Sequence, residues 1–118
     1  MSTSVIIAGS RSFDDYEFLS QTMNRILSDI NGDITIICGK ARGTDTLEER
    51  YAIEHGYSIR HFPADSKRYG KCAGYIRNTE MARNADVLVA FWNGQSHGTR
   101  HMIETAKSMG LEVYIEQH

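Results

Sequence analysis

Short runs rich in apolar residues, separated by polar segments, constrain the fold most. The clearest run is 86–91, Asp-Val-Leu-Val-Ala-Phe, and the others cover 4–8, 33–38, 58–63 and 111–115. In the strongest runs the apolar residues are consecutive, which is typical of strands buried on both faces of a parallel sheet with helices above and below. The sequence therefore predicts an α/β protein with a mostly parallel, five-stranded sheet.

The segments between these runs show helical periodicity instead. Asp14 or Asp15 can cap a first helix whose apolar residues run from Phe18 to Ile30 and which ends at Asn31-Gly32. Further helices are predicted over residues 46–55, 75–84 and 99–109, and residues 64–74 are predicted to form a polar loop. Strands and helices that alternate in this way, joined by right-handed crossovers, form a Rossmann-like three-layer sandwich.

Length and composition predict one globular domain over residues 1–118, with 41% hydrophobic and 24% charged residues. The formal net charge of −2 argues against nucleic acid as a partner, because nucleic-acid-binding domains are usually basic. No apolar run approaches the roughly 20 residues that a membrane span requires. Cys38 and Cys72 form no disulfide framework, and the sequence begins with no signal-peptide-like segment, so we expect a cytoplasmic protein.

The segment Cys38-Gly39-Lys40-Ala41-Arg42-Gly43-Thr44-Asp45 joins a predicted strand to a predicted helix. Its two glycines let the backbone turn tightly beside a ligand, and its lysine and arginine carry charges that suit a phosphate. The helix that follows begins with unpaired N–H groups, and Thr44 or Asp45 can cap it. The segment is therefore a predicted anion site; an ordinary capped connection is the alternative.

Two further glycine-containing turns should meet this segment. Gly9-Ser10-Arg11 and Asn93-Gly94-Gln95-Ser96-His97-Gly98-Thr99 each follow a predicted strand. In parallel sheets, ligands bind beyond the carboxyl ends of the strands, where the strand order reverses. The amides of Gly98 and Thr99 can face an anion, with Thr99 as the helix cap. Trp92 can stack on a base or a ribose, or pack at the end of its strand.

A fourth segment, Gly70-Lys71-Cys72-Ala73-Gly74, leads into a predicted helix that carries Arg77 and Asn78 near its start. An arginine at this place can hold a phosphate through two parallel hydrogen bonds. The alternative is a solvated helix face, but two glycines that flank a lysine indicate a shaped loop.

Several common chemistries lack their motifs in this sequence. The Walker A order is absent, the first turn does not match G-x-G-x-x-G, and no acidic residue ends the second strand. His97 and His101 are four residues apart, but no third metal ligand accompanies them. We therefore expect no nicotinamide cofactor, no other bound cofactor and no metal.

These motifs resemble the SLOG superfamily, which includes the SMF/DprA and Lonely Guy proteins, and in particular its YspA-like branch, a domain of unknown function common in bacteria and phages. The resemblance covers nearly the whole chain. It rests on Ala8-Gly9-Ser10-Arg11, Gly39 to Asp45, Gly70 to Gly74, Ile76-Arg77-Asn78 with Met81, and Gly94 with Gly98-Thr99. It implies a Rossmann-like fold, a pocket for a nucleotide-derived ligand, and a homo-oligomer, expected to be a dimer.

Lonely Guy relatives cut the N-glycosidic bond of a nucleoside monophosphate, with a glutamate soon after the Gly-Thr of a Pro-Gly-Gly-x-Gly-Thr loop. Here no acid follows Thr99 until Glu104, whereas the other Gly-Thr is followed by Asp45 and then Glu48. Either carboxylate can stabilise an oxocarbenium-like ribosyl centre or activate water. The alternatives are that Asp45 is a helix cap and Glu48 an exposed helix residue.

The sequence thus favours binding of a nucleotide or ribose-phosphate ligand at the carboxyl edge of the sheet. The alternative is an N-glycosidic (phospho)ribohydrolase or ribosyltransferase, and a DNA-associated module is a third reading against which the acidic charge counts. The predicted ligand-binding residues are Gly9, Ser10, Arg11, Gly39, Lys40, Arg42, Gly43, Thr44, Arg77, Asn78, Asn93, Gly94, Gly98 and Thr99.

Overall fold

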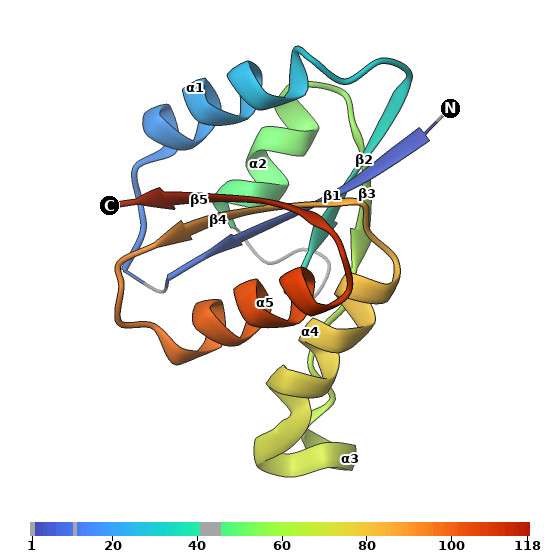
Figure 1. Ribbon diagram of the computed structural model, residues 1–118, viewed down its shortest axis with the longest axis vertical. Helices are drawn as coiled ribbons and strands as arrows, with labels where there is room; N and C mark the ends of the chain where they lie inside the picture. The colour runs from blue at the N-terminus through green and yellow to red at the C-terminus, as the bar shows by residue number, and fades with distance from the viewer. Residues whose placement is uncertain (1, 11, 41–45) are drawn as a thin grey trace.

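The computed structural model describes residues 2–10, 12–40 and 46–118, and these contain one five-stranded sheet (Figure 1). The strands are β1 (Ser2–Gly9), β2 (Asp33–Cys38), β3 (Ser58–His61), β4 (Val87–Trp92) and β5 (Glu112–Gln117). Their order is β3-β2-β1-β4-β5, and every neighbouring pair is parallel. The predicted α/β fold with a five-stranded sheet is confirmed, and the sheet is parallel throughout.

The helices follow the strands in alternation, as predicted. They are α1 (Tyr16–Leu27), α2 (Leu47–Glu54), α3 (Ser66–Tyr69), α4 (Ala73–Arg83) and α5 (His97–Ser108), with a 3-10 turn over Gly70–Cys72 before α4. The prediction of a plain loop over 64–74 is wrong, because the Asp65 side chain accepts a hydrogen bond from the Arg68 amide and starts a helical turn. That turn buries no side chain, so the sequence contains no apolar pattern that would predict it.

The helices cover both faces of the sheet and complete a Rossmann-like three-layer sandwich. Val5 and Ile7 of β1 face α1 and α2, where they pack in one buried cluster with Leu19, Met23 and Tyr51. Ile6 of β1 faces α4 and α5, where a second cluster contains Leu88, Met81, Met102 and Ile103. The central strands are therefore apolar at consecutive positions because each of their faces meets a helical layer.

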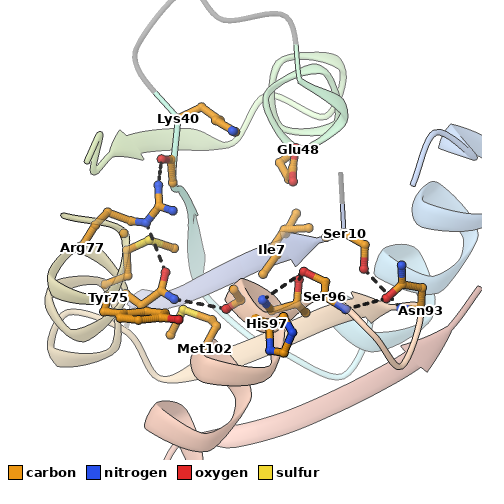
Figure 2. A pocket seen from close by; sticks show the side chains of 18 of the residues that line it. Ile7, Ser10, Lys40, Glu48, Tyr75, Arg77, Asn93, Ser96, His97 and Met102 are labelled. Atoms are coloured by element: carbon orange, nitrogen blue, oxygen red, sulfur yellow. Dashed lines mark hydrogen bonds between the residues drawn. The ribbon is translucent and has the colours of Figure 1, made fainter. Parts of the chain in front are cut away.

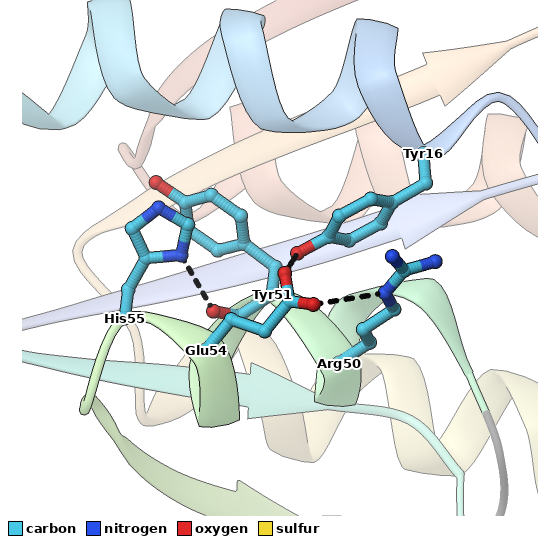
Figure 3. A network of polar contacts seen from close by, with 5 residues as sticks. All are labelled: Tyr16, Arg50, Tyr51, Glu54 and His55. Carbon is cyan, nitrogen blue, oxygen red and sulfur yellow. Dashed lines mark hydrogen bonds and ion pairs between the residues drawn. The ribbon is translucent and has the colours of Figure 1, made fainter.

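Polar contacts fasten α1 to α2 above their shared apolar cluster (Figure 3). The Tyr16 hydroxyl donates to the Glu54 carboxylate, which also pairs with Arg50 at 3.2 Å, and the Arg50 guanidinium lies 3.8 Å from the centre of the Tyr16 ring. Tyr51 is fully buried, and its hydroxyl donates to Asn24 at 2.7 Å. These bonds set the position of α2, which contributes to the candidate site.

The helix caps differ from the predicted ones in two places. Asp15 caps α1 and is one of the two residues predicted for this role. Thr46 caps α2 through the Glu49 amide, so the predicted cap at Thr44 or Asp45 is wrong, although those two residues lie outside the described ranges. Ser96 caps α5 by accepting from the Thr99 amide at 3.4 Å, so Thr99 is not the cap. In both cases the cap is the hydroxyl residue directly before the first helical residue, where the backbone is extended as a cap requires.

The strand order reverses between β1 and β4, because the chain moves outward to β2 and β3 and then returns to the other side of β1. In open α/β sheets this is where a crevice forms beyond the carboxyl ends of the strands. The longest helices in the described part of the chain, α1 and α5, have 12 residues each, and no helix there could cross a membrane.

Candidate functional site

A cavity of about 640 Å³ opens at the carboxyl ends of β1, β2 and β4, where the strand order reverses (Figure 2). Its volume lies in the usual range for small-molecule sites, about 300–1,000 Å³. Of the residues predicted to form a site, those that line it are Gly9, Ser10, Gly39, Lys40, Glu48, Arg77, Asn78, Asn93, Gly98 and Thr99. Sequence reasoning thus predicted ten of the residues that line this cavity, although they come from four elements, β1, α2, α4 and α5, and from the loops after β1, β2 and β4.

The remaining predicted site residues do not line the cavity or cannot be assigned. Within the described ranges, Gly94 is not a lining residue, and its positive φ of 81° instead serves the turn after β4. The predictions for Arg11, Arg42, Gly43, Thr44 and Asp45 fall outside the described residues.

The turn between β4 and α5 is built by its own side chains. The Asn93 side-chain oxygen accepts from the amides of Gln95 and Ser96 at 2.8 and 2.9 Å. The buried Ser10 hydroxyl accepts from the Asn93 amide at 3.2 Å and thereby joins this turn to the end of β1. The Thr99 amide is engaged by Ser96, whereas the first amides of α5, those of His97 and Gly98, have no acceptor within the helix.

Arg77 crosses from α4 to the loop after β2. Its guanidinium donates to the Gly39 backbone carbonyl and, through Nε, to the Asn78 side chain at 3.1 Å. Burial lowers the pKa of Arg77, but an arginine side chain stays protonated in proteins. The sequence prediction assigned the space beside Gly39 to a ligand, and in the structure the Arg77 guanidinium occupies it.

Asn78 is buried at the junction of α4 and α5. Its side-chain nitrogen lies 3.3 Å from the Gly98 carbonyl, to which it donates, and 3.1 Å from Nδ1 of His101. Since its oxygen accepts from Arg77, both ends of the amide are used within the protein. Asn78 therefore acts as a positioning residue that connects Arg77 to the first turn of α5.

Glu48 reaches into the cavity from α2, opposite the wall formed by α4 and α5 (Figure 2). It is half-buried, so the alternative of an exposed helix residue is wrong. Burial raises the pKa of its carboxyl group, and this outweighs hydrogen bonds from its own amide and from Thr46 and the positive charge of Lys40. A carboxyl group with a raised pKa keeps its proton to a higher pH than an exposed carboxyl group does, which suits a general acid or base.

Sequence reasoning missed the apolar wall of the cavity. Tyr75, Met81 and Met102 line it together with Arg77 and Asn78. Met81 and Met102 belong to the buried cluster beneath α4 and α5, and only the packed structure shows that this cluster continues into the cavity. Trp92, proposed as a stacking residue, is not a lining residue in the described chain; its indole N–H donates to the Ser96 carbonyl at 3.1 Å, so the alternative of packing at the strand end fits.

The cavity therefore offers two kinds of surface. Cations, hydroxyl groups and helix amides suit an anion, and an apolar wall suits a planar or aliphatic group. Within residues 2–10, 12–40 and 46–118, no group of three His, Cys, Asp or Glu side chains could hold a metal ion.

A parallel α/β sandwich with such a cavity at its switch point belongs to the broad class of Rossmann-like ligand-binding folds. Comparison with known proteins narrows this class. The model of the YspA, cpYpsA-related SLOG family matches residues 3–69, more than half of the chain. The chain is also 35% identical over 115 residues to the Gene 61 protein of Mycobacterium phage D29, with 92% of each chain covered. The chain belongs to the YspA, cpYpsA-related SLOG family, as the sequence motifs indicated.

Proposed function

We propose that this protein binds a nucleotide or a nucleotide-derived ribose phosphate in the cavity at the carboxyl edge of its sheet. The observation that carries the proposal is the convergence of Lys40, Arg77 and the first turn of α5 on one cavity of about 640 Å³. Positive charge and helix amides stabilise a phosphate. Membership of a SLOG family supports a nucleotide-related ligand over other anions.

The polar end of the cavity is suited to the phosphate. The Gly98 amide lies in the first turn of α5, where the helix dipole favours an anion. No atom within 4 Å would meet a Cβ placed on Gly98, so space is open at this position. Hydroxyl groups of Ser10 and Ser96 border the same region and can bind a phosphate or a sugar.

Equilibrium binding of AMP and ribose 5-phosphate to the purified protein tests the proposal, together with native mass spectrometry for a co-purifying nucleotide. Lys40→Ala is expected to weaken binding by about 10-fold or more, since a hydrogen bond to a charged group contributes about 1.5–3 kcal/mol. Lys107→Ala, in the last turn of α5 away from the cavity, is the matched control. Equal affinity of both variants and the unaltered protein would count against this site.

Turnover of the ligand is the second candidate function, as an N-glycosidic (phospho)ribohydrolase or ribosyltransferase. Glu48 favours it, because its half-buried carboxyl group lines the cavity and can act as an acid, a base or a stabiliser of ribosyl charge. Incubation with nucleoside monophosphates and NAD, with chromatography for the released base, tests it. Release by the unaltered protein and none by Glu48→Gln would support the enzyme; release by both would remove Glu48 from that role.

We also propose that the protein acts in the cytoplasm, because its cysteines form no disulfide. From the resemblance to its family we further propose that it is a homodimer. Both described cysteines are free, Cys38 buried and Cys72 exposed. Light scattering during gel filtration measures the mass, and a monomer at micromolar concentration would contradict the dimer.

A further inference from the structure

We propose that Tyr75, supported by His101, is the residue on which a planar base of the ligand stacks, so that the site distinguishes a complete nucleotide from a bare sugar phosphate. The proposal rests on the function proposed above and specifies which part of the ligand is recognised at the α4 side of the cavity.

Tyr75 lies in the first turns of α4 at the rim of the cavity, and 48% of its surface is exposed. Single exposed aromatic residues are common on protein surfaces and need no ligand to explain them. Tyr75 differs because it lines a cavity and because one side of its ring is already covered.

His101 of α5 covers that side. The two ring centroids are 4.4 Å apart, with 37° between the ring planes. His101 is itself held, since Nδ1 lies 3.1 Å from the Asn78 side-chain nitrogen and Nε2 lies 3.4 Å from the Thr105 hydroxyl. A ring supported in this way loses little further freedom when a ligand binds, which favours stacking on its other side.

The surroundings of Tyr75 offer apolar contacts to a base, and the nearby Arg77 guanidinium is already bonded to the Gly39 carbonyl and the Asn78 side chain. Met81 and Met102 also line the cavity, with 3% and 2% of their surfaces exposed. Polarisable methionine sulfur and an aromatic ring suit a planar heteroaromatic group. Figure 2 shows Tyr75 and Asn93 at opposite ends of the cavity, so a ligand with its phosphate at the first turn of α5 can extend its base toward α4.

The test compares ligands that differ only in the base. AMP, UMP and ribose 5-phosphate are titrated calorimetrically into the unaltered protein, Tyr75→Phe, Tyr75→Leu and Tyr75→Ala. Tyr69→Ala is the matched control, because Tyr69 is also an exposed tyrosine near the start of α4 but does not line this cavity. Thermal unfolding of each variant establishes that it is folded, and Tyr75→Leu preserves apolar volume if the alanine variant fails to fold.

We expect AMP to bind the unaltered protein more tightly than ribose 5-phosphate, and AMP more tightly than UMP because a purine stacks over a larger area. Tyr75→Ala and Tyr75→Leu should weaken AMP binding on the order of 10-fold, as loss of base stacking does elsewhere. Tyr75→Phe and Tyr69→Ala should leave it within about twofold, and ribose 5-phosphate should bind all variants alike.

The outcomes separate the two proposals. If AMP and ribose 5-phosphate bind but Tyr75→Leu does not change the AMP affinity, or weakens both ligands equally, the stacking role is wrong and the proposed function stands. If neither AMP, UMP nor ribose 5-phosphate binds the unaltered protein, the proposed function is wrong and the stacking role falls with it.

Discussion

The Arg77 guanidinium donates to the backbone carbonyl of Gly39 and fills the space where a side chain at position 39 would lie. A Cβ at position 39 would come within 2.9 Å of Nη1 of Arg77. Glycine is thus needed here for the approach of another part of the protein, and α4 is tied to the end of β2.

Gly39→Ala should displace Arg77 while leaving the fold intact. The crowded atom is at the far end of a flexible side chain, so the loss in the free energy of unfolding should not exceed the about 1.5–3 kcal/mol of one hydrogen bond to a charged group. AMP affinity should fall several-fold, because the cation leaves its place beside the cavity. Chemical denaturation and calorimetry measure the two effects.

Gly74→Ala is the matched control for that substitution, since a Cβ at position 74 would meet Arg77 only at 4.0 Å. Alanine in place of this α4 glycine should stabilise the protein by up to about 1 kcal/mol. A large loss of stability in Gly39→Ala would mean that the backbone, and not Arg77, yields to the new side chain.

Asn78→Leu should be clearly destabilising. The substitution removes three hydrogen-bonding partners at a buried position, among them the side-chain donor to the Gly98 carbonyl. Such a loss costs about 1–3 kcal/mol, visible as a lower denaturation midpoint. Asn84→Leu at the end of α4 serves as the control, because its one side-chain bond, to the Glu80 carbonyl, is exposed; equal losses in both variants would contradict a special role for Asn78.

Glu48→Gln should change how stability depends on pH. Because burial raises the pKa of Glu48 above its unfolded value of 4.5, the folded protein favours the protonated carboxyl group. Its contribution to stability is fully present below pH 4.5 and is lost as the pH rises through the higher folded pKa. The glutamine variant cannot lose that proton, so its stability relative to the unaltered protein should improve from pH 4 to 8, and parallel melting curves across this range would argue against a buried carboxyl group.

The two cysteines should react at very different rates. Burial raises the pKa of Cys38 to about 12, with the carboxylates of Glu48 and Glu49 adding to the rise, so its reactive thiolate is scarce. Cys72 is exposed on the turn before α4. Ellman's reagent should modify one thiol quickly in the folded protein and none quickly in Cys72→Ser; two fast thiols would mean that β2 opens readily.

Tyr16 should ionise late in an alkaline titration. Burial first, and then the hydrogen bond to Glu54, raise the pKa of Tyr16 from 10.0 to about 12. The protonated hydroxyl therefore stabilises the contact between α1 and α2 below pH 10, and this contribution is lost as the pH approaches 12. The difference in ultraviolet absorbance between the protein and Tyr16→Phe follows this step directly, and an ionisation centred near pH 10 would contradict the Glu54 contact.

The fold could be predicted because its signals are local. The consecutive apolar residues of β4 and the glycines and polar residues between elements indicate strands, helices and their order without knowledge of the packing. The helical turn at Ser66–Tyr69 was not predicted because a single polar turn has no apolar periodicity. The caps at Thr46 and Ser96 were not predicted because several hydroxyl and acidic residues near each helix start could act as the cap.

The site was predictable only in part. That Lys40, Arg77 and Gly98 share one cavity follows from parallel topology, since each lies at or beyond the carboxyl end of a strand or on the helix beside it. How Arg77 is used does not follow, because its bond to Gly39 depends on the distance between α4 and β2. The same holds for Tyr75, whose contact with His101 arises from the packing of α4 against α5.

β1 lies between β2 and β4 in the sheet (Figure 1) and is hydrogen-bonded to both strands. During translation, β1 and β2 leave the ribosome before β4, which follows only after α2, β3, α3 and α4. Until β4 is made, the edge of β1 that will pair with it therefore has unpaired backbone N–H and C=O groups, which can bind any extended peptide nearby. The sheet, and with it the cavity between β1 and β4, can be completed only once β4 is made, and until then this edge depends on protection from wrong pairing.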